Sequence, residues 1–173
     1  MGSLTPASIT AYLSLGSNVG NRMANLERAL ELLNATAGIT VVRRSSIYET
    51  EPWGVTEQPP FLNAAVEIRT SLEPGDLLAA VKAIEEAMRR ATTVRYGPRN
   101  IDVDILLYGT LVVNWETPDL QIPHSRMLER AFVLIPLAEI AGHIQHPTAS
   151  KPISNLKATV QGKEGVVLWS ETR

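Results

Sequence analysis

The chain has 173 residues, a formal net charge of −2 and no cysteine. This length fits one domain with its own core, and the lack of cysteine excludes disulfide scaffolds, thiolate zinc sites and cysteine nucleophiles. With 45% hydrophobic and 20% charged residues the composition is that of a folded protein, and the small negative charge excludes an overall attraction to nucleic acid or anionic lipid.

The first half of the chain predicts strands and one helix. Residues 11–15 (AYLSL) alternate with period two and run into the turn cluster GSNVGN, which predicts a strand and its end. A stripe of one methionine and three leucines at helical spacing follows, with Gly38 as its stop signal. Residues 39–50 then form a β-rich run, and the proline-rich run 50–60 predicts a loop.

The second half predicts a further strand, a second helix and another strand. Residues 61–71 (FLNAAVEIRTS) alternate as a strand, and Pro74 suits the first turn of a second helix. Residues 89–99 (RRATTVRYGPR) break all periodicity and lead into the strand NIDVDILLYG. After it, TLVVN can return as a short hairpin strand, and HSRMLERAFVLIPLAEIA predicts short helical pieces.

The resulting order, β-α-β-β-α-β, predicts an α+β fold of the ferredoxin-like kind, an antiparallel sheet with helices on one face. We expect a single domain over residues 1–173, with a core at about 10–142 and a tail at 143–173. The first ten residues lack the features of a signal peptide, and the longest apolar stretch, 131–142, is too short to span a bilayer. A cytoplasmic monomer is expected.

Two aspartates interrupt the most hydrophobic strand. Period two puts Asp102 and Asp104 on one face, about 7 Å apart along the backbone, with Leu106 and Tyr108. The alternate residues form a core-facing row of Ile101, Val103, Ile105 and Leu107. Solvated strand residues are the simplest explanation, but two like charges this close repel unless a cation lies between them. Magnesium, which uses one or two protein carboxylates plus substrate phosphates, would fit.

A cluster of bases precedes these aspartates. Arg89, Arg90, Arg95 and Arg99 fall within eleven residues that contain no acid. Each alone could be a solvated surface residue. Carboxylates for a metal next to arginines for phosphate oxygens are, however, the groups that phosphoryl transfer needs, because its catalysis is mainly positioning and charge neutralisation.

Two weaker candidates come from histidine, aromatic and amide side chains. His124 lies close to Arg126 and Arg130, which favours contact with a polyphosphate, although a structural role is equally compatible. Phe61 and Asn63 share one face of their predicted strand. Core packing is the default for a phenylalanine, yet this pair could stack on a flat heterocycle and bond its edge.

These segments resemble the 6-hydroxymethyl-7,8-dihydropterin pyrophosphokinase family. The likeness covers most of residues 11–142, through AYLSLGSN, FLNAAV, RYGPRNIDVDILLYG and IPHSRMLERAFVLIPLAEI, of which GPRNIDVDILLYG is the most specific. It implies Mg²⁺-dependent transfer of pyrophosphate from ATP to a pterin alcohol, with release of AMP, in folate biosynthesis. The partners implied are these small molecules alone, with no nucleic acid and no membrane.

The resemblance also implies roles for individual residues. Asp102 and Asp104 would bind two Mg²⁺ ions, with Arg90 and Arg99 as catalytic contacts to the transferring phosphates, although Arg89 could replace Arg90. The remaining ATP contacts would be Glu85, Ile105, His124 and Arg130. The pterin contacts would be Thr50, Trp53, Phe61, Asn63, Asp102 and Phe132, with loops at 54–60 and 91–95 closing over the substrates.

The chain departs from the family pattern in places, with Thr92 where a second loop arginine is common and Tyr96 where tryptophan is found. Two rival functions stay open. A two-metal phosphohydrolase could use the same aspartates, and a ferredoxin-like nucleic-acid-binding module would need exposed aromatics and a basic face. The second rival is disfavoured because the strand carries acids and aromatics make up only 5% of the chain.

Overall fold

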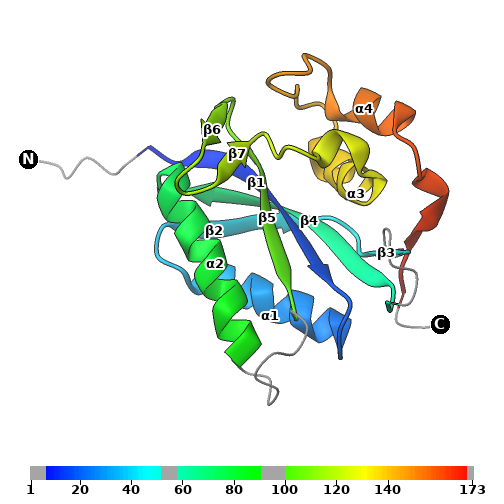
Figure 1. Ribbon diagram of the computed structural model, residues 1–173, viewed down its shortest axis with the longest axis horizontal. Coiled ribbons are helices and arrows are strands. Elements are labelled where there is room, and N and C mark those ends of the chain that lie inside the picture. Colours follow the sequence, from blue (N-terminus) through cyan, green and yellow to red (C-terminus); the bar gives the residue numbers. More distant parts are fainter. Residues whose placement is uncertain (1–6, 52–57, 91–99, 171–173) are drawn as a thin grey trace, which may run out of the picture.

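The computed structural model of the chain describes residues 7–51, 58–90 and 100–170 (Figure 1). The elements follow in the order β1 (Ile9–Ser17), α1 (Arg22–Ala35), β2 (Ile39–Arg44), β3 (Tyr48–Thr50), β4 (Phe61–Thr70), α2 (Pro74–Arg90), β5 (Asp102–Tyr108), β6 (Val113–Trp115), β7 (Leu120–Ile122), α3 (Ala131–Ala141), α4 (Ile153–Thr159) and β8 (Val166–Leu168). Short 3₁₀ turns lie at Met127–Glu129 and Lys163–Gly165. The predicted β-α-β-β-α-β order is confirmed through β5, with the second strand in two pieces.

The second predicted strand divides at Ser45. The Ser45 N–H donates to the Ala65 carbonyl at 2.8 Å, but the Ala65 N–H donates back to the Ser45 hydroxyl at 2.9 Å. Because a side-chain oxygen takes the place of a backbone carbonyl, the regular ladder stops there. Both pieces, β2 and β3, therefore pair separately with β4, each antiparallel.

The main sheet has the strand order β5-β1-β4-β3-β8, and β2 also pairs with β4. Every pairing in it is antiparallel. The order of the core strands, with β1 and β4 in the middle, is that of a ferredoxin-like sheet. The tail contributes to this sheet, because β8 pairs with β3 from Tyr48 opposite Leu168 to Thr50 opposite Val166 (Figure 1).

Both faces of the sheet are covered, which differs from the one-sided arrangement expected. Residues of α1 and α2 pack with alternate residues of β4, such as Leu62 and Val66, in one core. Ala65, between them, belongs to a second core with α3 and α4 on the opposite face. Most of α3 is buried because its side chains are apolar nearly all round; the buried ones are Ala131, Val133, Leu134, Pro136, Leu137, Ile140 and Ala141.

The strand β5 changes phase in its middle. Its register with β1 skips Leu106, which makes this residue a β-bulge. Before the bulge, Ile105 and the other alternate residues pack toward α1 and α2 as predicted. After it, Tyr108 packs toward α1 and α2, and Leu107 packs toward α3. The predicted rows are therefore wrong for Leu107 and Tyr108, because one extra residue inverts the alternation.

The segment after β5 forms a separate hairpin. β6 pairs with β7, with Val113 opposite Ile122, in a two-stranded sheet of its own. TLVVN thus takes part in a hairpin, but its partner is the strand that follows it. None of the described helices is long and apolar enough to cross a membrane.

Candidate functional site

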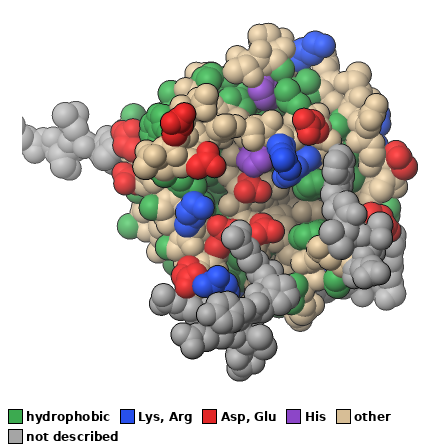
Figure 2. All heavy atoms as spheres, viewed as in Figure 1, with side chains coloured by type: hydrophobic (Ala, Val, Ile, Leu, Met, Phe, Trp, Pro, Cys, Tyr) green, Lys and Arg blue, Asp and Glu red, His purple; other side chains and the backbone are tan. Residues whose placement is uncertain are grey.

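The acidic strand β5 lies where two cavities meet. Asp102 and Asp104 are half-buried and pair across the sheet with Gly16 and Ser14 of β1. Both carboxylates line a first cavity of about 310 Å³ and a second of about 240 Å³. Figure 2, seen from the same side as Figure 1, shows acidic side chains gathered in the middle of this face, with histidine and basic side chains beside them.

The first cavity lies between α2, β5 and β7 with the residues on either side of β7. Its lining includes Glu85, Ile105 and His124, three of the residues expected near ATP. A Glu85 carboxylate oxygen accepts a hydrogen bond from the Val103 N–H at 3.4 Å, which ties α2 to β5 next to the aspartates. The lining also includes residues that the sequence interpretation missed, namely Lys82, Asp119, Gln121 and Ser125. Lys82 is a single charged residue between apolar neighbours on its helix, and nothing in the sequence separates it from a solvated lysine.

His124 is held so that one ring nitrogen faces the acidic strand. Its backbone N–H donates to the Leu106 carbonyl at 3.0 Å, and its Nδ1 accepts from the Arg126 N–H at 3.2 Å. A neutral His124 therefore carries its proton on Nε2, which lies 4.0 Å from a carboxylate oxygen of Asp104. Burial lowers the pKa of His124, Asp104 opposes this effect, and Arg130 adds to it.

The second cavity lies between β1, β3, β4 and the start of α3. It is lined by Thr50, Phe61, Asn63 and Phe132, all expected at the pterin. Arg130, which the resemblance assigned to ATP, lines this cavity rather than the first. Its guanidinium carbon lies 5.5 Å from the centre of the Phe132 ring, a cation–π distance.

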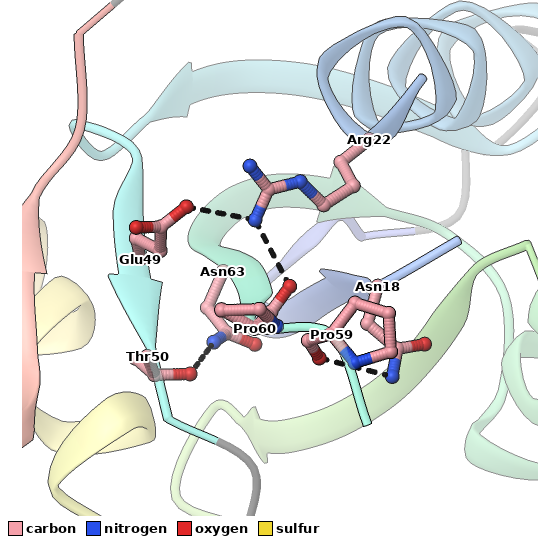
Figure 3. Close-up of polar contacts among 7 residues, drawn as sticks. All are labelled: Asn18, Arg22, Glu49, Thr50, Pro59, Pro60 and Asn63. Atoms are coloured by element: carbon pink, nitrogen blue, oxygen red, sulfur yellow. Dashed lines mark hydrogen bonds and ion pairs between the residues drawn. The ribbon is translucent and has the colours of Figure 1, made fainter. Parts of the chain in front are cut away.

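The polar wall of the second cavity is prearranged. The Asn63 side-chain amide donates to the Thr50 hydroxyl at 2.7 Å, and both residues are only 4% exposed (Figure 3). Gly16 makes room for this amide, because a Cβ there would lie 2.8 Å from the side-chain oxygen Oδ1 of Asn63. The turn expected at Gly16 is therefore wrong: β1 extends through it to Ser17. Glycine inside a strand commonly marks such a close approach, which is the signal that could have identified it.

The side chains of three expected site residues lie outside the part of the chain that the structure describes. Trp53 and Arg99 lie outside the described residues, and of Arg90 only the backbone is described, at the last position of α2. The alternative to it, Arg89, is half-exposed and forms an ion pair with Glu86 of its own helix at 3.4 Å.

The two carboxylates on β5 suit Mg²⁺, which substrate phosphates help to bind. They are too few for a metal ion that protein side chains bind alone. Among the described residues no group of three or more histidine, aspartate or glutamate side chains is placed to hold a metal ion. Two carboxylates two residues apart are the hard oxygen donors that Mg²⁺ uses when substrate phosphates and water complete its shell. Asp102 and Asp104 would be the protein ligands.

Comparison with known proteins points in one direction. A model of the family 7,8-dihydro-6-hydroxymethylpterin-pyrophosphokinase matches residues 12–142. The 2-amino-4-hydroxy-6-hydroxymethyldihydropteridine pyrophosphokinase of Bacillus subtilis is 45% identical over 161 residues, 93% of this chain and 90% of that protein. The enzyme of the same name from Methylorubrum extorquens is 53% identical over 131 residues, 76% of this chain and 82% of that protein.

Other matches are longer proteins. A mitochondrial folate synthesis bifunctional protein of Arabidopsis thaliana is 50% identical over 130 residues, 75% of this chain but 23% of that protein. The crystal structure of wild-type Plasmodium falciparum HPPK-DHPS matches with a TM-score of 0.71 and 17% identity, over 90% of this chain and 45% of that one. At this identity the structural match shows the fold alone, and the chain spans less than half of the solved protein.

Proposed function

Because the chain belongs to the 7,8-dihydro-6-hydroxymethylpterin-pyrophosphokinase family, we propose that it transfers pyrophosphate from ATP to 6-hydroxymethyl-7,8-dihydropterin, with Mg²⁺ bound and with release of AMP. As a member of this family it is an ATP-dependent diphosphotransferase of folate biosynthesis. The observation that carries the proposal is the position of Asp102 and Asp104 in the lining of both cavities. A polyphosphate in the first cavity and an alcohol in the second would meet at these carboxylates.

The reaction needs one bond formed and one broken. The hydroxymethyl oxygen of the pterin attacks the β-phosphorus of ATP, and the bond from that phosphorus to the oxygen bridging to the α-phosphate breaks. The electron pair leaves with AMP, and the hydroxyl proton passes to solvent. Two Mg²⁺ ions, when bound, would supply the charge neutralisation that in-line displacement requires. Asp102 and Asp104 would hold them, and Arg99 with Arg90 or Arg89 would contact the transferring phosphates.

The second cavity suits a flat heterocycle that carries polar groups on its edge. Phe61 and Phe132 supply aromatic surface, and the buried Asn63 and Thr50 supply hydrogen-bonding groups. The Asn63 amide uses one of its two N–H groups on Thr50, so its other N–H and the Thr50 hydroxyl proton can bond the pterin. Bonds made by groups already fixed in place cost little ordering on binding.

The test is to mix the protein with Mg·ATP and 6-hydroxymethyl-7,8-dihydropterin and to follow AMP. We expect one AMP for each pterin consumed, and no reaction when the pterin or Mg²⁺ is omitted. Release of inorganic phosphate from ATP without the pterin would instead identify a phosphohydrolase. A complete mixture that forms no AMP would refute the proposal.

A further inference from the structure

Arg22, the first residue of α1, bridges two segments that lie far from it in sequence. A single nitrogen of its guanidinium, Nη1, donates to a Glu49 carboxylate oxygen at 2.8 Å and to the Pro60 carbonyl at 2.9 Å (Figure 3). None of these three residues lines either cavity. We call this arrangement the Arg22 bridge.

The Arg22 bridge spans the place where β3 and β4 leave the sheet. Glu49 precedes Thr50, the last residue of β3, and Pro60 precedes Phe61, the first residue of β4. Thr50 and Phe61 form the final register pair between these strands, and both line the second cavity. One guanidinium therefore holds both strand ends from which two walls of that cavity project.

A second contact reinforces the β4 side of this arrangement. The side-chain amide of Asn18 donates to the Pro59 carbonyl at 3.4 Å (Figure 3). It also donates to the Gln58 side-chain oxygen at 3.3 Å. These bonds are longer and more exposed than those of Arg22. We therefore expect the Arg22 bridge, with its shorter and charged hydrogen bonds, to stabilise the strand ends more than Asn18 does.

The Arg22 bridge differs from an ordinary surface ion pair. Exposed pairs contribute little because water screens them and side-chain entropy opposes them. The pair of Arg28 with Glu31 on the same helix is of that kind, with side chains 60% and 68% exposed. The side chains of Arg22 and Glu49 are 23% and 32% exposed, and the additional bond to a backbone carbonyl fixes the main chain itself.

We propose that Arg22 is a positioning residue for the pterin, which rests on the function proposed above. By bridging Glu49 and the Pro60 carbonyl it keeps Thr50 and Phe61 at the separation that the heterocycle needs, without touching either substrate. Its loss should therefore weaken binding of the pterin and leave the first cavity, and with it ATP, much less affected.

The test compares Arg22→Gln with the matched control Arg28→Gln in steady-state assays of AMP formation. For Arg22→Gln we expect the KM of the pterin to rise about five- to tenfold, the size typical of one lost hydrogen bond. The KM of ATP should stay within about twofold of the unmodified protein. Arg22→Lys, which keeps a cationic donor, should recover part of the loss, and Arg28→Gln should change neither KM.

A gentler variant guards against misfolding. Glu49→Gln keeps an acceptor for Arg22 and removes only the charge, so it should raise the KM of the pterin less than Arg22→Gln does. An equal rise of both KM values in Arg22→Gln, or an unchanged KM for the pterin, would overturn the positioning role. Failure of the unmodified protein to form AMP would overturn the proposed function itself, so the two failures are distinguishable.

Discussion

The two cavities that meet at β5 are built differently. The first has charged and exposed side chains in its lining, including Lys82 and Asp119. The second is walled by strand residues whose polar groups are buried and already bonded, such as Asn63 on Thr50. If the proposed function holds, the first cavity would attract a charged ligand through charges that can move. The second would hold a flat ligand through groups that are fixed in place. Substitutions that act on one cavity, or on both, test this contrast.

The largest effect on activity is expected at the two carboxylates that line both cavities. Asp102→Ala and Asp104→Ala should each lower the turnover for AMP formation by about 10²- to 10³-fold, as loss of a group that supports transition-state charge does. The fold should persist, because both side chains are only half-buried and like charges are removed. Circular dichroism is the control. Near-normal turnover in either variant would contradict the metal assignment.

An intermediate effect is expected from a substitution that acts on the second cavity alone. Gly16→Ala places a Cβ 2.8 Å from the side-chain oxygen Oδ1 of Asn63, so the side-chain amide must move. We expect the KM of the pterin to rise about tenfold or more, since a displaced buried bond costs about 1–3 kcal/mol, while the KM of ATP changes little. The control is Gly165→Ala, because a Cβ there meets nothing within 4 Å. Parallel increases in both KM values would contradict the separation of the cavities.

The smallest effect concerns stability where α3 meets the segment that leads into β3. Glu139 of α3 accepts from the Tyr48 hydroxyl at 2.7 Å and from the Ser46 N–H at 2.6 Å, which joins α3 to the segment that carries Thr50. Burial tends to raise the pKa of Glu139, but these hydrogen bonds outweigh it and lower the pKa below 4.5. Burial and the same contact raise the pKa of Tyr48 to about 12.

The sign of the pH dependence follows from the lowered pKa of Glu139. Its contribution to stability is present above pH 4.5 and is lost as the pH falls through the value in the folded protein. Glu139→Gln should lower Tm by about 2–4 °C at neutral pH, as expected for about 1 kcal/mol in a protein of this size. The difference from the unmodified protein should shrink in acid. A gap that widens below pH 4.5 would contradict this assignment.

Local patterns in the sequence predicted what depends on near neighbours. Period two separated Asp102 and Asp104 from the buried row, and the helical stripe located α1. Contacts made across the fold could not be predicted in this way. Arg22 bonds groups 27 and 38 residues away, so no window around α1 shows its role. Gly16 was interpreted as a turn because the residue that needs its missing side chain, Asn63, lies on another strand.

The tail and α3 show the same limit. No element was predicted in the tail at 143–173, yet β8 extends the sheet there because it pairs with the edge of β3. The segment of α3 was expected as short pieces, but it forms one helix of 11 residues that continues through Pro136. Burial of its apolar side chains against the sheet outweighs the hydrogen bond that a proline removes.

The bulge at Leu106 lets the two halves of β5 serve separate tasks. Upstream of it the strand must present Asp102 and Asp104 to the cavities, and downstream the Tyr108 hydroxyl donates to the Leu72 carbonyl at 2.7 Å. In a regular strand Tyr108 would lie on the same face as Asp102 and Asp104 and could not reach Leu72 on the opposite side. With the phase reset between them, the direction of the aspartates and the direction of Tyr108 are set independently.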